Sequence, residues 1–392
     1  MKKILLMMAG AFVFWAPQMS AQTQRPEKCG MHALHDAMIA QDPSWAQKFE
    51  DQKASLQAAA DYYLQLKASG TLEKTTTISA VPVIFHIIVD SAQFNNLGGT
   101  AGIIKRCDSQ IVVLNRDFNK HNADSTLIPS GWKSLYGNPG ISFGLARKDP
   151  SGNCSPGYEV KIISGNTLTD AGFDSVCWAF PDAKRAGTGL PSWDYTKYYN
   201  VWCINFTNGS GSCFQGVGLL GLTVPLSQGT ATNQVGVCIL YNTLGTTGPT
   251  GSDPGTGAWS APYNLGRTLT HETGHFFEIW HPWGDDGGLC PWNGGSDDGL
   301  SDTPPEGDAV YGNPVYTITG GTYNDGCKMN GATNTQPIGI ACLSYMDYTD
   351  DNAMHMFTKM QAAAMASMVL VPATGGAGAT GYGTIGESYS LT

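Results

Sequence analysis

The segment from Leu269 to His281, LTHETGHFFEIWH, constrains this chain more than any other, because it carries three histidines and a glutamate at metal-ligand spacing. On a helix, His271 and His275 are four residues apart and lie on one face, so both imidazoles can reach one zinc ion at about 2.0 to 2.1 Å. Glu272 stands beside them, where its carboxylate can address a water on that ion. The segment therefore predicts a helix that supplies two zinc ligands and a general base.

A third ligand requires a change of direction. His281 lies about 240° further around an ideal helix than His275, given 3.6 residues per turn. It can bind the same ion only if the helix ends and the chain doubles back, so we expect a break near Glu278. Three of the chain's 8 histidines fall in this segment, although only 14% of all residues are charged. This clustering favours a zinc site over a surface helix with ordinary histidines.

The zinc motif, followed far downstream by SYMDYTDD at 344–351, resembles the metzincin clan, and within it the pappalysin-like metallopeptidases of secreted bacterial type. The resemblance covers most of the chain. It implies that Met346 lies in a tight turn beneath the zinc ligands and that Tyr348 hydrogen-bonds the reacting carbonyl. The chain departs from the family pattern HExxHxxGxxH at Glu278, where glycine is usual. A non-glycine residue in a left-handed turn costs about 1 to 2 kcal/mol, which a folded domain can absorb.

The fold that this resemblance implies is an α/β metzincin-type domain with two lobes, a twisted and mostly parallel sheet, an active-site helix and a methionine turn. The implied activity is that of a zinc metalloendopeptidase acting on protein or peptide substrates. Three neutral imidazoles leave an open position on zinc, where the pKa of a bound water falls towards 7. Glu272 would act on that water as general base and then on the leaving amine as general acid.

An acidic, glycine-rich stretch between the zinc helix and the methionine turn offers hard oxygen donors that suit calcium. Its residues 298–304, DGLSDTP, resemble the family's calcium-binding DxVxDTP stretch. That resemblance implies Asp298, Asp302 and Thr303 as ligands, together with the main-chain oxygen of Leu300. The spacing does not fit the twelve-residue helix-loop-helix calcium loop, and a solvated acidic loop is the alternative.

The start of the chain predicts export. Residues 1–21 have a basic beginning, an apolar run and small residues at the end, as a secretory signal peptide has. No later stretch reaches about 20 apolar residues, so we expect no membrane anchor and an extracellular or periplasmic location. The remaining chain divides into a polar prosegment at 22–78, a catalytic domain at 79–371 and a flexible Gly/Ala/Thr-rich tail at 372–392.

Ten cysteines in an exported chain favour disulfides. Proximity in the sequence suggests the pairs Cys203–Cys213, Cys154–Cys177 and Cys290–Cys327. Cys29 lies in the prosegment, and some relatives stay latent through a propeptide cysteine bound to zinc. A zinc latch and an ordinary disulfide are equally open for it. A latch would leave an odd number of cysteines in the remaining domain, with Cys107 as a candidate free thiol.

Apolar periodicity predicts the elements of the domain. We expect a buried strand over 81–90, in which His86 is a satisfied core histidine, and a helix at 44–69 in the prosegment. A long helix should pack on that strand through Ile103, Ile104, Ile111, Val112 and Leu114. Further strands are expected at 141–149, 198–206, 218–226 and 234–241, and Thr358 and Gln361 have capping-box spacing before a helix at 359–370.

The net charge of the chain and the residues expected at its substrate cleft indicate which partners it can bind. A net charge of −10 and a pI near 5.2 make nucleic acid an unsuitable partner. The resemblance implies that the strand at 218–226 is an edge strand above the cleft, where it can bind an extended peptide. Asp347, Asp350 and Asp351 favour a basic residue after the scissile bond, and a role as solvated or helix-capping carboxylates is the alternative. Two alternatives stay open: an inactive binding protein with this fold, and a zinc hydrolase of cell-wall peptide or amide substrates. The sequence does not define the oligomeric state.

Overall fold

The computed structural model describes residues 27–71, 80–164, 183–205, 219–226, 235–246, 262–285, 290, 295–314 and 339–370. The predicted signal peptide, the boundary of the prosegment at 78 and the tail at 372–392 lie outside these residues. Among the helices that are described, none is long and apolar enough to cross a membrane.

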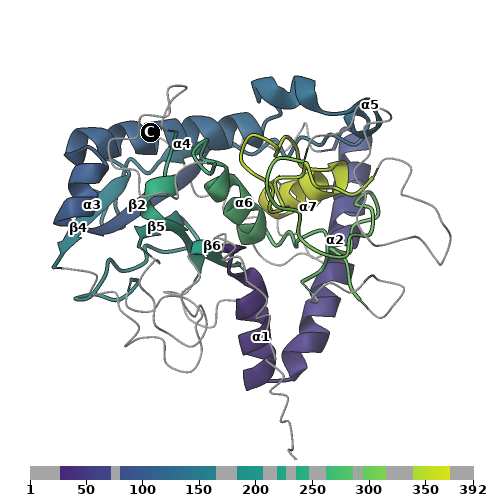
Figure 1. Ribbon diagram of the computed structural model, residues 1–392, viewed down its shortest axis with the longest axis horizontal. Coiled ribbons are helices and arrows are strands. Elements are labelled where there is room, and N and C mark those ends of the chain that lie inside the picture. Colours follow the sequence, from purple (N-terminus) through teal and green to yellow (C-terminus); the bar gives the residue numbers. More distant parts are fainter. Residues whose placement is uncertain are drawn as a thin grey trace, which may run out of the picture.

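A seven-stranded sheet forms the centre of the fold (Figure 1). Its strands run in the order β1-β6-β7-β5-β2-β3, and β4 also pairs with β2. Their bounds are β1 Glu27–Cys29, β2 Val81–Asp90, β3 Phe143–Leu145, β4 Tyr158–Ile163, β5 Tyr199–Ile204, β6 Leu219–Val224 and β7 Gly236–Leu240. The pairing of β6 with β7 is antiparallel, and the other pairings are parallel. The predicted mostly parallel sheet is confirmed.

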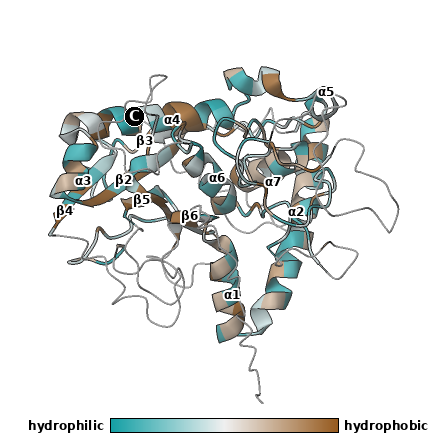
Figure 2. Cartoon of the chain, viewed as in Figure 1, coloured by the Kyte–Doolittle hydropathy of each residue, from teal (hydrophilic) through white to brown (hydrophobic). Residues whose placement is uncertain are grey.

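The strands owe their position to continuous apolar runs. The first nine residues of β2 are buried, as expected of a parallel strand covered on both faces. Figure 2 shows β2, β5 and β6 as hydrophobic. The helices α3 (Ser91–Asn96) and α4 (Gly99–Asp117) run along the sheet. In α4, however, Ile104 and Val112 are 40% and 55% exposed, so these two predicted core residues were wrong: they lie outside the stripe formed by Ile103, Cys107 and Leu114.

The predicted prosegment contributes ordered structure to this fold. Helices α1 (Met31–Gln41) and α2 (Ser44–Ala68) follow β1, and α2 lies beside α7 (Lys359–Leu370). The helices expected at 44–69 and 359–370 are confirmed. So is the capping box, since the Thr358 amide donates to Gln361 Oε1 at 3.0 Å and the Gln361 amide donates to Thr358 Oγ1 at 3.2 Å. The sequence patterns did not predict β1, α1 or β4.

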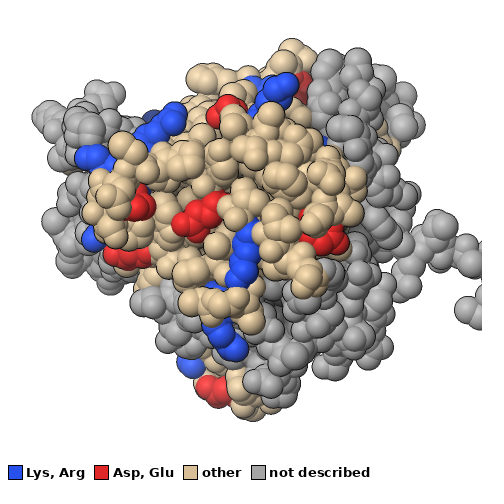
Figure 3. Space-filling view, turned by 90° about the vertical axis from the view of Figure 1, so that its left-hand side faces the viewer, with Lys and Arg blue, Asp and Glu red and all other residues tan. Residues whose placement is uncertain are grey.

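Short elements complete the described chain. They are the 3-10 helices η2 (Ala123–Leu127) and η3 (Tyr241–Thr243), and the helices α5 (Ser130–Lys133) and α6 (Arg267–Phe276). Helix α6 lies between the sheet and α7 (Figure 1). On the face drawn in Figure 3, the described Lys and Arg side chains are interspersed with Asp and Glu. That face presents no large basic patch among its described residues.

Two of the predicted disulfides are wrong. Cys154 and Cys203 are free thiols, so neither forms the pair suggested by sequence proximity. Cys203 lies fully buried in the central strand β5, where its side chain is part of the core. Cys107 is also free, as proposed, and so is Cys29. Cys290 is disulfide-bonded, whereas Cys327, its suggested partner, lies outside the described residues.

His86 is a satisfied core histidine, as expected. Its Nε2 lies 2.9 Å from Asn200 Oδ1 and its Nδ1 lies 3.1 Å from Glu159 Oε2. Asn200 also accepts from the Trp193 amide at 2.8 Å and donates to the Trp193 carbonyl at 2.9 Å. The single amide side chain of Asn200 therefore pairs polar groups from β2 and from the segment before β5.

Replacing Asn200 with alanine should destabilise the domain by about 3 kcal/mol, because it leaves several buried polar groups without partners. Urea unfolding of the full-length chain measures the loss. Val112→Ala, at an exposed position of α4, is the control and should change stability by less than about 0.5 kcal/mol. Equal effects of the two substitutions would contradict the structural role of Asn200.

Candidate zinc centre

Helix α6 is fixed at its start by the segment after the methionine turn. Asp351 Oδ2 accepts hydrogen bonds from the amides of Leu265 at 2.8 Å and Arg267 at 3.2 Å. Arg267 in turn donates to the Asp351 carbonyl at 2.7 Å. A carboxylate at a helix N-terminus satisfies unpaired amides and complements the helix dipole. All ten residues of α6 are buried, so the helix is locked in position by its surroundings.

Helix α6 ends just before Glu278, where a break was predicted so that His281 could reach the metal. Glu278 has φ 66°, the left-handed conformation expected for the break. The Ile279 amide donates to the Gly274 carbonyl at 3.0 Å and the Glu278 amide to the His275 carbonyl at 2.8 Å. These bonds close a helix C-terminus of the kind that a left-handed residue allows. The predicted reversal of the chain before His281 is therefore confirmed, with glutamate in place of the usual glycine.

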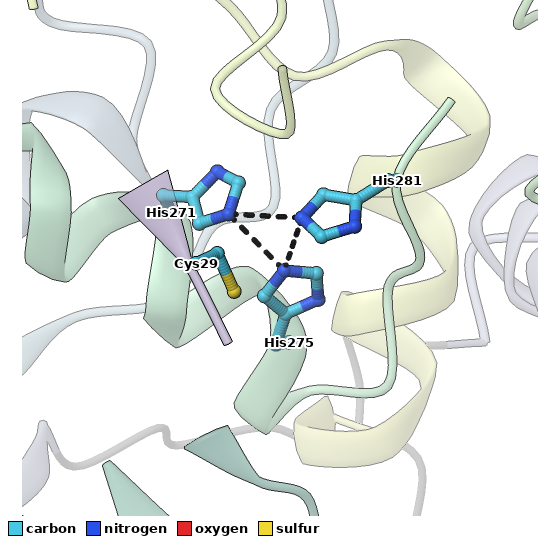
Figure 4. A group of neighbouring side chains, drawn as sticks. All are labelled: Cys29, His271, His275 and His281. Atoms are coloured by element: carbon cyan, nitrogen blue, oxygen red, sulfur yellow. Dashed lines mark hydrogen bonds between the residues drawn. The ribbon is translucent and has the colours of Figure 1, made fainter. Parts of the chain in front are cut away.

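The reversal brings the three imidazoles together (Figure 4). The Nε2 atom of His275 lies 3.1 Å from that of His271 and 2.9 Å from that of His281, and the last two are 3.2 Å apart. Tetrahedral zinc with bonds of about 2.0 to 2.1 Å would separate its ligands by about 3.3 Å. Burial lowers the pKa of His271 and His275 well below its usual value, which favours the neutral form that a metal ligand needs. The trio fits zinc.

Each imidazole is oriented through its other nitrogen. The Nδ1 atoms of His271 and His275 donate to the carbonyls of Tyr345 and Ile279, both at 2.7 Å. His281 Nδ1 donates to Asp285 Oδ1 at 2.5 Å. Because all three acceptors hold the proton on Nδ1, the Nε2 lone pairs point to the common centre. Asp285 is the one acceptor of the three that is a side chain.

Glu272 lies beside the imidazoles and is fully buried. Thr223 Oγ1 on β6 donates to its Oε2 at 2.6 Å. Burial raises the pKa of Glu272 to about 8, and the hydrogen bonds of Thr223 and Cys29 and the charge of Lys28 act in the opposite direction. Burial thus favours the protonated form of this carboxyl, a perturbation that is common at functional sites.

The methionine turn passes beneath α6. The Asp347 amide donates to the Ser344 carbonyl at 3.1 Å, which closes a tight turn around Met346. A Cβ atom on Gly274 would lie 2.3 Å from Met346 Sδ, so the sulfur packs directly against the helix backbone. The Tyr348 ring lies 4.9 Å from the His281 ring, and its hydroxyl donates to the Cys29 carbonyl at 3.0 Å.

Cys29 lies beside the histidine trio. Its Sγ and the ligand nitrogens of the three histidines all lie within 4.8 Å of one another (Figure 4). Strand β1 carries it there by pairing with β6, with Cys29 opposite Gly221. The adjacent Lys28 is also buried, and its Nζ donates to the Thr349 carbonyl at 2.6 Å. Burial lowers the pKa of Lys28 to about 8, against the attraction of Asp351, Asp347 and Asp350.

The residues predicted to bind calcium are only partly brought together. Asp298, Leu300 and Thr303 are buried in one turn, where Asp298 Oδ1 accepts from the Leu300 amide at 3.0 Å. Asp302 faces α7 instead: its two oxygens accept from Thr358 Oγ1 at 2.8 Å and from the Met360 amide at 3.0 Å. The carboxylate of Asp302 therefore serves the N-terminus of that helix.

Several residues of the centre were missed by sequence reasoning. Thr223, Asp285 and Lys28 belong to no spacing motif. For Asp351, a helix cap was one of the alternatives that the sequence left open, and the structure places its carboxylate at the start of α6. The sequence offered a hint for two of them: Lys28 is next to the latch candidate Cys29, and Asp285 follows the predicted ligand His281 by four residues. Thr223 had none, because its partner lies 49 residues away.

The sheet, the reversed helix end and three imidazoles beside a buried glutamate define a zinc metallopeptidase of the metzincin type. Comparison with known proteins agrees. Residues 255–370 match the peptidase M43 family model, described as pregnancy-associated plasma protein-A. Extracellular metalloprotease 1 of Coccidioides posadasii is 38% identical over 112 residues, which are 29% of this chain and 33% of that protein. The match thus spans about a third of that relative's length.

Two solved structures extend the likeness. Mature mirolysin of Tannerella forsythia, in complex with a cleaved peptide, is 34% identical with a TM-score of 0.59 and covers 75% of this chain and 92% of its own. A promirolysin mutant from the same organism is 29% identical with a TM-score of 0.67 and covers 92% of this chain and 97% of its own. The chain belongs to the pappalysin-like M43 family of metalloproteases.

Replacing Asp285 with asparagine should weaken zinc binding about 10- to 100-fold, because the amide holds the His281 imidazole less firmly than the carboxylate does. Competition with a chromogenic chelator at pH 7.5 measures the affinity. Asp108→Asn, at an exposed position of α4, is the matched control and should leave it unchanged. An unaltered affinity in Asp285→Asn would show that this hydrogen bond does not orient the ligand.

Proposed function

We propose that this chain is an exported bacterial zinc endopeptidase in which His271, His275 and His281 hold the metal and Glu272 is the general base and acid. The observation that carries the proposal is the convergence of three Nε2 atoms within 3.2 Å of one another beside a buried carboxylate. Curated relatives of this family are named extracellular metalloproteases, and the N-terminal residues have the character of a signal peptide.

The protein's own groups divide the work of hydrolysis. When bound, zinc supplies a Lewis acid that polarises the scissile carbonyl and acidifies a water. Glu272 accepts the proton of the attacking water and delivers it to the leaving amine. Tyr348 donates a hydrogen bond to the oxyanion that develops on the carbonyl. Its hydroxyl now bonds the Cys29 carbonyl, so it becomes available when the prosegment leaves.

Residues 22–78 act as an inhibitory prosegment, with Cys29 as a latch on the metal. In support, the Cys29 thiol lies with the three ligand nitrogens, and β1 occupies the edge of β6 on which a substrate would lie. The promirolysin mutant covers 92% of this chain and mature mirolysin covers 75%, as expected if a prosegment is present in the first and removed in the second. An ordinary disulfide at Cys29 has no support, because the thiol is free.

The substrate is an extended peptide with a basic residue after the scissile bond. Mature mirolysin was solved with a cleaved peptide, and in this chain the edge of β6 that β1 now covers could pair with an extended peptide once β1 has left. Lys28 supports the basic preference, because its ammonium is buried while Asp351, Asp347 and Asp350 attract it. A substrate lysine or arginine would find the same negative field once Lys28 has left.

Calcium is proposed for the turn at 298–303. Asp298 is fully buried and Thr303 is 5% exposed, and burial raises the pKa of the Asp298 carboxyl well above its usual value. A cation would stabilise such a carboxylate in its charged form. The Leu300 carbonyl belongs to the same turn, whereas Asp302 would have to share its oxygens with the start of α7.

Glu272→Ala should lower the hydrolysis of a quenched fluorescent peptide library by at least about 10²-fold, since it removes the general base. The assay uses enzyme processed from the full-length chain, with zinc and calcium, and a chelator as the second control. Cleavage before Lys or Arg that disappears in both controls supports the proposal. A protein that binds zinc but cleaves nothing would be the inactive binder, and one that cleaves only cell-wall peptides would be the amide hydrolase.

Cys29→Ser should shorten the lag before activity appears by at least about tenfold, because serine is a weak zinc ligand and the latch is lost. The lag is measured on freshly purified full-length protein. Cys107→Ser, at another buried free thiol, is the matched control and should leave the lag unchanged. A lag that is equally long in Cys29→Ser would contradict the latch.

Calcium removal should lower the melting temperature of the full-length protein, and Asp298→Asn should abolish that sensitivity. The reason is that a bound cation stabilises only the folded state that binds it. Differential scanning calorimetry with calcium or with a calcium-selective chelator makes the comparison. Asp308→Asn, at an exposed position nearby, should melt as the parent does. A parent protein with the same melting temperature in both buffers has no calcium site.

A further inference from the structure

One face of strand β6, which lies between β1 and β7 in the sheet, contacts the carboxylate of Glu272. Residues two apart on a strand point to the same side, so Gly221 and Thr223 share this face. We propose that Thr223 is a positioning residue for Glu272: its hydroxyl holds one carboxylate oxygen so that the other is directed at the metal-bound reactants. The proposal rests on the role of Glu272 proposed above and assigns to β6 a part in the proton transfer.

The contact between Thr223 and Glu272 is short and lies away from solvent. Thr223 Oγ1 lies 2.6 Å from Glu272 Oε2 and 3.0 Å from the Glu272 carbonyl, and both residues are fully buried. A hydrogen bond from a hydroxyl to a carboxylate is among the stronger kinds and is strengthened where water is excluded. With Oε2 held in this way, Oε1 remains as the oxygen that can exchange a proton.

Gly221 defines the position of the other oxygen. A Cβ atom at Gly221 would lie 2.3 Å from Glu272 Oε1 and 2.6 Å from its Cδ, closer than real Cβ atoms approach. The missing side chain thus leaves the space that Oε1 fills. Strand β6 therefore restricts the carboxylate twice, by a donor at Thr223 and by a recess at Gly221.

Activation makes the role of Thr223 more important. In the latent chain, the Thr223 hydroxyl bonds Glu272 Oε2, and the neighbouring Cys29 and Lys28 also favour the charged form of the carboxyl. Cys29 and Lys28 both belong to the prosegment. Of these three groups, only Thr223 stays once the prosegment has gone. A carboxylate displaced by about 1 Å from its productive position can lose about 10²-fold in rate, so the remaining hydrogen bond should bear directly on turnover.

The test compares Thr223→Val, which keeps the shape and loses the donor, with Thr223→Ser, which keeps the donor. Enzyme processed from the full-length chain is assayed on one fluorescent peptide. We expect kcat to fall at least about tenfold in Thr223→Val, with KM within about twofold, and to stay within about threefold of the parent in Thr223→Ser. Leu222→Val, on the opposite face of β6, is the control for damage to the strand.

Two readouts separate positioning from a structural role. Zinc affinity, from chelator competition, should be the same in all variants. A peptide hydroxamate hydrogen-bonds the general base in place of the reactants, and its Kd should rise at least about fivefold in Thr223→Val alone. If Thr223→Val does not fold, Thr223→Ala takes its place.

The proposal is overturned if Thr223→Val keeps its kcat, if Thr223→Ser is equally impaired, or if zinc is lost along with activity. Glu272→Ala distinguishes the two levels of inference. If Glu272→Ala remains active, the general base itself has been misassigned. If it is inactive while Thr223→Val is not, only the positioning role fails.

Discussion

The left-handed turn at Glu278 is the constraint on which the zinc centre depends. Without it, the imidazole of His281 would point away from those of His271 and His275, since a continuing helix separates them by about 240°. The turn costs a non-glycine residue about 1 to 2 kcal/mol. Two hydrogen bonds to the carbonyls of Gly274 and His275 offset that cost, as does the complete burial of the neighbouring Phe277 and Ile279. The same segment gives His275 its acceptor, so the turn builds one ligand and orients another.

Strand β6 connects the elements that surround this centre. One edge pairs with β7 and the other with β1, which carries Cys29 to the histidines. Its inner face contacts Glu272 through Gly221 and Thr223. The proposed latency, substrate binding and proton transfer would thus meet on six residues. Strand β1 covers the edge of β6 that could pair with an extended peptide once β1 has left, and one side-chain face of β6 contacts Glu272. A change in this strand would affect all three.

Burial determines the electrostatics of the centre. It lowers the pKa of His271 and His275 and raises that of Glu272 to about 8, so in each case it favours the uncharged form. Burial also disfavours the charged form of Lys28, which the nearby aspartates favour. The carboxylate of Asp351 has two roles: it stabilises the start of α6 and it attracts the ammonium of Lys28.

The sequence by itself determined the histidine trio, the place of Glu272 beside it, the break at Glu278 and the capping box of α7, because each depends on spacing within one or two helical turns. It also located most strands from their apolar runs. It misjudged Ile104 and Val112 and the pairs of Cys154 and Cys203, since burial and thiol pairing depend on which surfaces meet. Only the tertiary structure decided that Thr223 holds Glu272, 49 residues away, and that Lys28 reaches Thr349, 321 residues away. Such contacts arise from the pairing of β6 with β1 and its packing on α6, and no local pattern encodes them.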